Sequence, residues 1–453
     1  MSSRVTLLPS ARRLMDSLRE IGYDLPSAVA DIVDNSIAAK AKRVELTFAF
    51  DGADSWIRIT DDGIGMTGAA LEEAMRYGTE RTYEPGELGR FGLGLKTASL
   101  SQCRRLTVAS RRGRERCRIE IRRWSLDHVA RTNRWEVLRI HPMEAPPELI
   151  DSLIEHPGTV VLWEGLDRVL DYRLPDGAAA RRGFDTLAAD TAGHIAMVFH
   201  RFLAGEARGR RPLTVALNES VICAWDPYAR SEPHTRQLAP QRVRLSPDGS
   251  AAALLVRPYL LPPQERFSSV AAHALTAGPQ RWNRQQGFYF YRGDRLIQAG
   301  GWSRLRTLDE HTKLARVAID LPPGSDELFS VNVAKMRVSI PSTLRGPLTA
   351  IASGVVAEAG ARYRIRLGSS HNGSTRPMRD HSAPAPMVSV LQHHERDLLR
   401  LIIAVAREEF REEPDVLRRL LSRIERLPAS APPTVDLAGI PVPREGSGSA
   451  LKS

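Results

Sequence analysis

Hydrophobic residues at helical spacing open the chain. Residues 10–21 form an amphipathic segment, and a second helical segment runs from Leu25 to Lys40. In the second segment the apolar positions i, i+3, i+4 and i+8 make one stripe: Val29, Ile32, Val33 and Ile37. Asp24 directly before this segment and Pro26 in its first turn are typical of a helix start. The pattern therefore predicts two N-terminal helices.

Runs of apolar and β-branched residues then predict strands. In the first part of the chain these runs are Val44–Phe50, Ser55–Thr60, Arg105–Ser110, Cys117–Trp124 and Thr159–Trp163. A glycine-rich stretch at 63–94 interrupts them. Helices followed by strands in this order predict an α/β fold, an α+β two-layer sandwich with helices on one face of a sheet.

The second half of the chain shows a similar mixed pattern. A helical stretch from Thr186 to Leu203 joins the two halves, and another helix is predicted at 341–363. The predicted strands between them are Leu213–Asn218, Ala252–Tyr259, Gly287–Arg292 and Leu314–Leu321. We expect domains at 1–180 and 181–367, a Gly-, Ser- and Pro-rich linker at 368–388, apolar-periodic C-terminal helices at 389–427 and a disordered tail at 428–453.

Composition narrows the class of protein. Of the 453 residues, 42% are hydrophobic, which is enough for a sizeable core. No apolar run approaches the ~18–20 residues that a membrane-spanning helix needs, and the N-terminus lacks the apolar core of a secretion signal. The three cysteines fit neither a metal-ligand spacing nor an even disulfide set. We therefore expect a cytoplasmic protein with no membrane contact.

The net charge of +11 is concentrated in one segment. Arg104–Arg123 contains nine Arg and two Glu, a net of +7 in twenty residues. Only six of the 64 cationic residues in the chain are Lys. A basic segment can supply contacts to nucleic-acid phosphates, but arginines that alternate along a strand are equally typical of a solvated sheet face. Both interpretations of the segment stay open at this point.

Two polar motifs before residue 70 are candidates for chemistry. Asp31 and Asn35 are spaced i, i+4 and project from one helix face, roughly opposite the apolar stripe. An acid suits a water-activating base and an amide oxygen suits a hard cation such as Mg²⁺, although a polar helix face is usually just solvated. The second motif, DDGIGM at 61–66, follows a predicted strand. An acid and two alternate glycines let the backbone approach a flat ligand, and the alternative is a plain turn.

The third motif, GELGRFGLGLKT at 86–97, runs into a predicted helix. Clustered glycines and a helix N-terminus offer N–H groups to phosphate oxygens, and Lys96 adds charge. The motif is not a Walker A loop, because the GKS/T ending is absent.

In order and spacing, the three motifs resemble the N, G1 and G2 boxes of the GHKL ATPases, the superfamily of DNA gyrase B, the ninety-kilodalton heat-shock chaperones, histidine kinases and MutL, with MORC proteins close by. The segments that carry the resemblance are AVADIVDNSIAAKA, ITDDGIGM and GRFGLGLKTAS. In the second half, GFYFYRGDRLIQAGGW and SVNVAKMRVSIP resemble transducer segments of the MORC and MutL groups. The resemblance implies a Bergerat-type GHKL ATP-binding domain, a ribosomal-protein-S5-like transducer domain, and ATP and Mg²⁺ as ligands.

The resemblance also implies roles for single residues. Asp31 would orient and deprotonate the attacking water, and Asn35 would coordinate Mg²⁺. Lys335 would enter from the transducer and stabilise charge on the γ-phosphoryl group. Asp61 would accept from the adenine amine. The remaining implied residues are Gly63, Gly65, Met66 and Thr159 in the base pocket, and Gly89, Phe91, Gly92, Leu93, Gly94 and Lys96 in a lid over the phosphates.

Two positions depart from the superfamily pattern. The base in much of the superfamily is Glu, and Asp31 is one methylene shorter. Because a misplacement of ~1 Å can reduce a rate on the order of 100-fold, we expect slow hydrolysis. Ala38 stands where the family often has Asp. Asp34 is an alternative base, three residues further round the helix.

The resemblance leads to three alternative functions. The first is an ATPase of MORC/MutL type, an ATP-gated clamp that pairs through its N-terminal domain as a homodimer and acts on DNA through Arg104–Arg123, in anti-phage defence or DNA repair. The second is a chaperone-like or signalling GHKL ATPase that remodels protein partners. The third is a nucleotide-binding scaffold without turnover. The C-terminal helices at 389–427 are expected to bind a protein partner or to dimerise.

Overall fold

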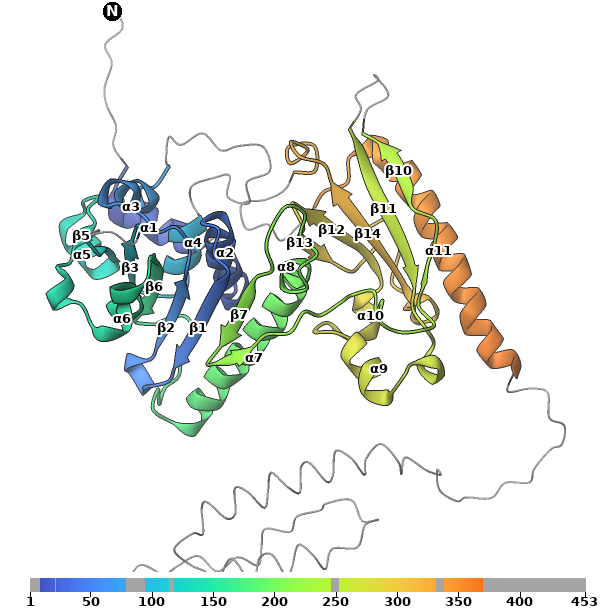
Figure 1. Ribbon diagram of the computed structural model, residues 1–453, viewed down its shortest axis with the longest axis horizontal. Helices are drawn as coiled ribbons and strands as arrows, with labels where there is room; N and C mark the ends of the chain where they lie inside the picture. The colour runs from blue at the N-terminus through green and yellow to red at the C-terminus, as the bar shows by residue number, and fades with distance from the viewer. Residues whose placement is uncertain are drawn as a thin grey trace, which may run out of the picture. The chain divides into compact units, whose positions relative to one another are not determined.

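The computed structural model describes residues 9–20, 22–78, 94–113, 118–245, 252–330 and 338–369. Two mixed sheets carry this part of the chain, and helices lie between and against them (Figure 1). The first sheet has the order β5-β4-β3-β6-β2-β1-β7-β8. Its strands are β1 (Arg43–Ala49), β2 (Trp56–Asp61), β3 (Arg105–Arg111), β4 (Glu120–Ser125), β5 (Leu138–Arg139), β6 (Gly158–Glu164), β7 (Thr214–Leu217) and β8 (Ser220–Val221).

The helices of the first half cover the two faces of this sheet unequally. They are α1 (Ala11–Arg19), α2 (Leu25–Ala38), α3 (Gly68–Met75), α4 (Gly94–Leu100), α5 (Leu126–Thr132), α6 (Pro147–Glu155), α7 (Ala178–Val198) and α8 (His200–Leu203). Alternate strand residues such as Leu46, Ile59 and Val161 pack with α1, α2, α4 and α7 in the main core. Residues of the other parity, such as Val160 and Leu162, pack with α6. The expectation of helices on one face is therefore corrected, because α6 covers part of the second face.

Helix α2 is buried on nearly all sides. It begins as expected, since the Asp24 carboxylate accepts from the Ser27 amide at 2.8 Å. The predicted apolar stripe is buried. Part of the opposite face is buried as well, because α4 and α7 pack against the helix: Asp31 is 3% exposed and Asp34 is 1% exposed. The expectation of a solvated face therefore fails for Asp31, whereas Asn35 is exposed.

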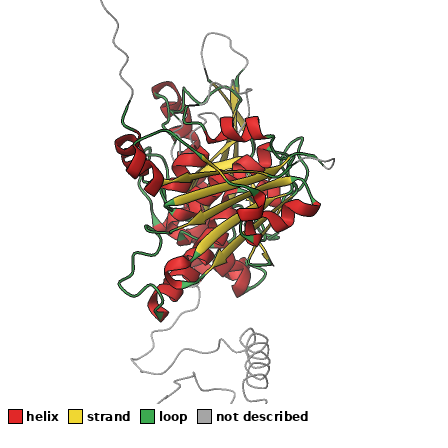
Figure 2. Cartoon of the chain, turned by 90° about the vertical axis from the view of Figure 1, so that its left-hand side faces the viewer, coloured by secondary structure: helices red, strands yellow, loops and turns green. Residues whose placement is uncertain are grey.

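The second sheet has the order β10-β11-β14-β12-β13, and a short strand, β9, pairs with β11. Its strands are β9 (Arg236–Gln237), β10 (Gln241–Arg244), β11 (Ala253–Leu260), β12 (Gly287–Arg292), β13 (Arg295–Ala299) and β14 (Ala315–Leu321). The helices of this half are α9 (Val270–Thr276), α10 (Arg281–Gln285) and α11 (Ser342–Ser369). Helix α11 packs on one face of this sheet, where side chains such as Val317 and Leu348 form a separate core. Figure 2 shows the strands as stacked layers with helices around them.

Most predicted strands lie within one or two residues of the observed ones. One group belongs to a different sheet from the one we expect: β7 pairs in parallel with β1, and β8 pairs with β7. The first sheet therefore includes strands beyond residue 180, where the sequence predicts the first domain to end. The linker predicted at 368–388 begins two residues too early, because α11 continues to Ser369. The rest of the linker, residues 1–8, Cys117, the C-terminal helices and the tail lie outside the described residues.

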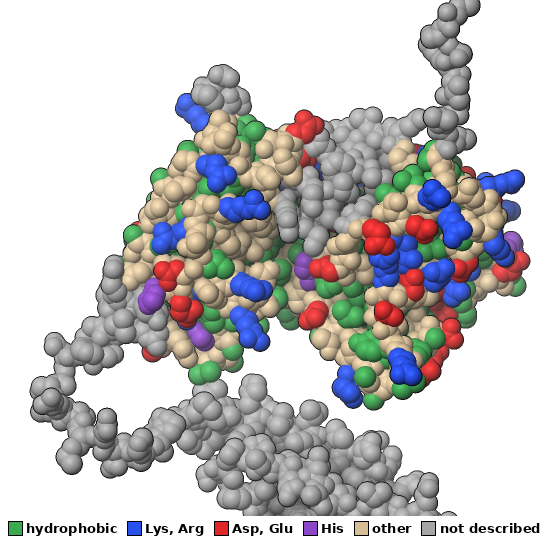
Figure 3. Space-filling model, turned by 180° about the vertical axis from the view of Figure 1, so that it is seen from behind, with side chains coloured by type: hydrophobic (Ala, Val, Ile, Leu, Met, Phe, Trp, Pro, Cys, Tyr) green, Lys and Arg blue, Asp and Glu red, His purple; other side chains and the backbone are tan. Residues whose placement is uncertain are grey.

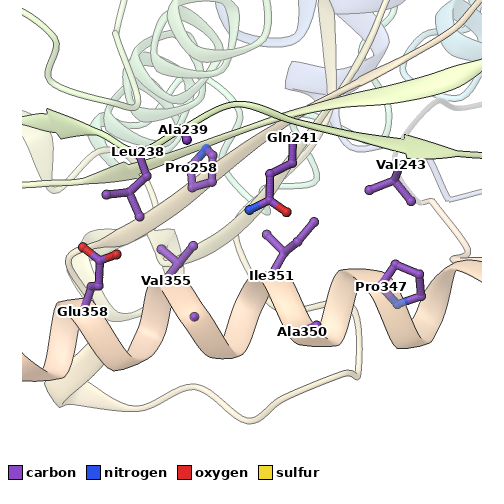
Figure 4. Close-up of a pocket in the computed structure, with 11 residues that line it drawn as sticks. Leu238, Ala239, Gln241, Val243, Pro258, Pro347, Ala350, Ile351, Val355 and Glu358 are labelled. Carbon is purple, nitrogen blue, oxygen red and sulfur yellow. The ribbon is translucent and has the colours of Figure 1, made fainter.

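A groove lies between α11 and the segment 238–243 with β11 (Figure 4). Its lining is mostly apolar, with Gln241 and Glu358 among the residues that line it. None of the candidate site residues lines this groove. No helix in the described ranges has the length and apolar character needed to cross a membrane.

Candidate functional site

Three polar side chains form a row across neighbouring strands of the first sheet. In the antiparallel registers, Asp61 on β2 is paired with Thr159 on β6, and Thr159 is paired with Ser110 on β3. The hydroxyls of Ser110 and Thr159 are 3.0 Å apart. The three residues share the parity of Ile59, Val108 and Val161, which face the helical layer. The row therefore lies between the end of the sheet and the helices.

Asp61 is held at both carboxylate oxygens. The Ser36 hydroxyl on α2 donates to Oδ2 at 2.9 Å, and the Gly63 amide donates to Oδ1 at 2.9 Å. Burial raises the pKa of Asp61 to about 6, and the Gly63 and Ser36 hydrogen bonds oppose part of that rise. A carboxylate in this state gains from a further donor such as an aromatic amine.

The loop after Asp61 is fixed against α2 and β3. Gly65 has φ +65°, and a Cβ there would lie 1.9 Å from the Arg111 carbonyl oxygen, so only glycine fits. The Met66 amide donates to Ser110 Oγ at 2.8 Å. The Asp62 carboxylate has other partners than Asp61: it accepts from the Lys42 and Arg43 amides at the start of β1.

Sequence reasoning missed Ser36 and Ser110. Both contact residues that it singled out, Asp61 and Met66 respectively. Ser110 ends the predicted strand 105–110, and its position beside Thr159 depends on the strand register, which the sequence pattern does not specify. Ser36 is adjacent to Asn35, but its approach to Asp61 requires the packing of α2 on the sheet.

Asp31 lies on α2 near the first residue of α4. The Tyr23 hydroxyl donates to Asp31 Oδ2 at 2.9 Å, and burial and the Asp31 charge raise the pKa of Tyr23, which keeps the phenol protonated. A Cβ added to Gly94 would lie 3.5 Å from the same oxygen, so the end of the glycine-rich motif does reach Asp31. Asn35, one turn further along, is exposed. The i, i+4 spacing thus places a buried acid and an accessible amide on one side of the helix.

Lys96, which the resemblance places in the lid over the phosphates, is a buried residue of α4. It is 2% exposed, and its ammonium donates to the Ala74 carbonyl at 2.9 Å and lies 5.9 Å from the centre of the Tyr77 ring. Burial lowers the pKa of Lys96 to about 8. The other lid residues, Gly89, Phe91, Gly92 and Leu93, and Lys335 lie outside the described residues.

A cation from the second sheet reaches α2. Arg295, on β13, donates from Nε to Asp34 Oδ1 at 2.9 Å, and its Nη2 lies 3.5 Å from Asp31 Oδ1. The resemblance implies a different cation from the second half, Lys335, as the contact to the γ-phosphoryl group. Arg295 was not singled out, because nothing local in its segment points to α2, 261 residues away.

The segment Arg104–Arg123 uses much of its charge within the domain. Its ion pairs with acidic side chains are Arg104 with Asp127 and Asp167, Arg105 and Arg123 with Glu164, and Arg122 with Glu72 and Glu120. Arg112 and Arg118 are exposed. On the face seen in Figure 3, basic and acidic side chains are interspersed. The net charge of the segment therefore overstates what it can offer to a phosphate backbone.

A metal ion at this site would depend on the nucleotide. Among the described residues there is no group of three or more His, Cys, Asp and Glu side chains that could hold a metal ion. Mg²⁺ does not need such a group, because it commonly binds through one or two protein oxygens together with phosphates and water. The accessible Asn35 amide fits that requirement.

Comparison with known proteins supports the resemblance for the first part of the chain. No curated protein matches the chain. The matching family model is described as histidine kinase-, DNA gyrase B-, and HSP90-like ATPase. Its match takes in Asp31, Asn35, Asp61 and the glycine-rich motif, and it ends just before Thr159. Residues 23–156 of this chain therefore form a GHKL-type ATPase domain.

Proposed function

We propose that the chain binds MgATP and hydrolyses it slowly at the site between α2 and the first sheet. The observation that carries this proposal is that α2 contacts both parts of one site. Its Ser36 donates to Asp61 in the row of polar side chains at the strand ends, and its Asp31 lies beside the start of α4. Phosphoryl transfer depends mainly on positioning and charge stabilisation, and this arrangement supplies fixed groups for both.

In this proposal the row of strand ends binds the base of the nucleotide. Asp61 accepts a hydrogen bond from the exocyclic amine of adenine, with Thr159 and Ser110 beside it. Gly63, Gly65 and Met66 form the wall of the pocket, where a side chain at Gly65 would collide with β3. The segment from Gly89 to Lys96 closes over the phosphates.

Asp31 is the proposed general base and Asp34 is not. Asp34 faces Arg295 Nε with both oxygens, at 2.8 and 2.9 Å, so it is already engaged in an ion pair. Asp31 receives a hydrogen bond from Tyr23 that orients its carboxylate next to Gly94. Asn35 would hold Mg²⁺, which supplies charge neutralisation for the phosphates. Lys335 is the proposed contact to the γ-phosphoryl group.

Phosphate release under multiple turnover tests the assignment of Asp31. The Asp31→Asn variant should lose at least ~100-fold in kcat, because an amide cannot accept the proton of the attacking water. Its affinity for ADP should stay within about threefold of wild type, since the contacts to adenine are unchanged. The control is Asp16→Asn, an exposed position on α1. Equal kcat for Asp31→Asn and wild type would show that Asp31 is not the base.

We further propose that ATP drives pairing of two copies and closure on DNA, as in a clamp of MORC/MutL type, with the second sheet as an S5-like transducer. The net charge of +11 and the exposed Arg112 and Arg118 support contact with DNA. Sizing with and without a non-hydrolysable ATP analogue, in the presence and absence of DNA, tests this. We expect a dimer with the analogue, and DNA binding that falls steeply with salt.

One observation favours the alternative, a GHKL ATPase that acts on protein partners. Arg104, Arg105, Arg122 and Arg123 form ion pairs inside the domain and are therefore less available to a polyanion. Absence of DNA binding at low salt, together with analogue-induced dimerisation, would reject the clamp and support this alternative.

A further inference from the structure

The second sheet has a free edge at β10. Within the described ranges this strand pairs only with β11. The Leu245 amide donates to the Ala252 carbonyl at 3.1 Å, and hydrogen-bonded pairs alternate along an antiparallel ladder. Arg242 and Arg244 lie between such pairs, so their backbone N–H and C=O groups point away from β11. An edge of this kind is a template on which another strand can pair.

A groove runs between this edge and α11, which lies alongside β10 in Figure 1. Gln241 and Val243 line the groove from β10, and Ile351 lines it from α11 (Figure 4). Its volume is about 500 Å³, which is in the range of protein binding pockets. Along α11 it extends from Pro347 to Glu358, a rise of about 16 Å that an extended strand covers with about five residues. An edge strand beside such a groove gives an added strand both backbone hydrogen bonds and pockets for alternate side chains.

One end of the groove carries an excess of positive charge. Glu358 is the acidic residue of the lining, and its carboxylate lies 3.5 Å from the Arg236 guanidinium. Arg362 follows one turn later on α11 and donates to the His234 carbonyl at 3.4 Å. Burial and the charges of Arg236 and Arg266 lower the pKa of Arg362, and the Glu358 charge opposes this. The arginine cluster, Arg236, Arg266 and Arg362, is therefore only partly neutralised by Glu358.

We propose that β10 and the groove bind an extended, acidic segment of a protein partner, which adds to the second sheet as a further strand. The backbone of the segment pairs with Arg242 and Arg244. Because side chains alternate along a strand, its apolar side chains enter the groove beside Val243, and its acidic side chains lie on the other face, beside the side chains of Arg242 and Arg244. An acidic residue at its end meets the arginine cluster. The site is on the second sheet, so this binding does not require ATP hydrolysis.

Charge and shape favour a protein segment over two other occupants. A second copy of this chain would bring the exposed Arg242 and Arg244 of its own β10 against the same two residues, and like charges on paired strands repel. A nucleic acid would contact the arginines through its phosphates, but it would neither fill an apolar groove nor pair with a strand edge. An acidic polypeptide matches the edge, the groove and the arginine cluster together.

Binding of a labelled synthetic peptide to the full-length protein, followed by fluorescence anisotropy, tests the proposal. The peptide has about ten residues, with valine and glutamate at alternate positions, so that one face is apolar and the other acidic. A matched peptide with lysine in place of glutamate should bind at least ~10-fold more weakly. Glu358→Gln removes the acid of the groove and should strengthen binding of the acidic peptide by about two- to fivefold, the effect of one surface charge.

Two glycines of α11 separate an effect on the groove from an effect on the fold. Gly354 lines the groove, and a Cβ there would meet no atom within 4 Å, so leucine fills the groove without a clash. Gly354→Leu should weaken binding of the acidic peptide at least ~10-fold, although leucine has the higher helix propensity. The control is Gly360→Leu, which also meets open space but does not line the groove and should leave the affinity unchanged.

Proline tests the backbone part of the site. Arg244→Pro removes an N–H that points away from β11, a position where an edge strand accepts proline, and should weaken binding at least ~10-fold. Arg244→Ala keeps this N–H and should lose much less.

Four outcomes would overturn the proposal. The first is no binding of the acidic peptide up to about 1 mM. The second is equal affinity of Gly354→Leu and Gly360→Leu for this peptide. The third is self-association of the protein that Arg244→Pro abolishes, which would assign the edge to a second copy. The fourth is displacement of the peptide by a single-stranded oligonucleotide that binds Gly354→Leu as well as wild type, which would assign the surface to nucleic acid.

Discussion

Replacing Asp61 with Asn removes a half-buried charge while keeping the shape of the side chain. Asp61 has a pKa of about 6, against a model-peptide value of 3.8, so the rise is about two units. At 1.36 kcal/mol per unit this corresponds to at most ~3 kcal/mol of destabilisation by the ionised form, and to less because the residue is partly exposed and water screens it. The nucleotide-free protein should therefore tolerate, and even gain from, the loss of this charge.

The sign of the pH dependence follows from the raised pKa. Between the unfolded pKa and about pH 6, the folded protein holds a proton on Asp61 that the unfolded chain has released, so stability falls as pH rises through this window. Asp61→Asn should match wild type near pH 4 and should be more stable, by up to ~3 kcal/mol, at pH 7.5. Urea unfolding at both pH values measures this difference. The control is Asp62→Asn, because Asp62 is exposed and accepts from two backbone amides.

Nucleotide affinity should change in the opposite direction. Loss of a hydrogen bond to a charged acceptor weakens binding by about 1.5–3 kcal/mol, so calorimetry should show an ADP affinity lower by about 10- to 150-fold at pH 7.5. Wild-type affinity should also fall below pH 6, as Asp61 takes up a proton, and the variant should lack this fall. Equal affinities would refute the assignment of Asp61 to adenine. A stability difference that is constant from pH 4 to 7.5 would refute the raised pKa.

Two further substitutions test the walls of the site. Gly65→Ala should lower the free energy of unfolding by ~2 kcal/mol or more, because its Cβ would overlap the Arg111 carbonyl. The control is Gly113→Ala, which has a similar φ of +71° but lies in open space. It should lower the free energy of unfolding by only the ~1–2 kcal/mol that a left-handed backbone conformation costs a residue with a Cβ. Urea unfolding that ranks the two alike would contradict the packing argument. Ser110→Ala removes the acceptor of the Met66 amide and should destabilise the fold by about 1–3 kcal/mol while weakening ADP binding. Unchanged ADP affinity in this variant would exclude Ser110 from the site.

Much of the ATPase domain could be predicted from the sequence. The helix at 25–38 follows from its apolar spacing and its Asp24 cap, and the motif at 61–66 follows from an acid and two glycines after a strand. Such signals are local, because periodicity, caps and turns depend on residues a few positions apart. The family match over residues 23–156 takes in both of these segments.

The burial of Asp31 and Asp34 could not be predicted in this way. A helix with one apolar stripe is expected to leave its other face in water. Here α4 and α7 pack against the helix, and α7 begins 140 residues after α2 ends. Of the polar pair that the sequence singles out, Asn35 is exposed and Asp31 is buried beside Asp34 and Arg295.

The sequence by itself determined which segments become helices and strands, and which acids and glycines stand at their ends. The tertiary structure alone decided which of these ends meet. Strand register placed Ser110 and Thr159 beside Asp61, and the β12–β13 hairpin brought Arg295 to Asp34 across 261 residues. The physical reason is that local signals act along a few residues of chain, whereas register and the docking of layers are settled by the burial of whole faces, which only the assembled fold possesses.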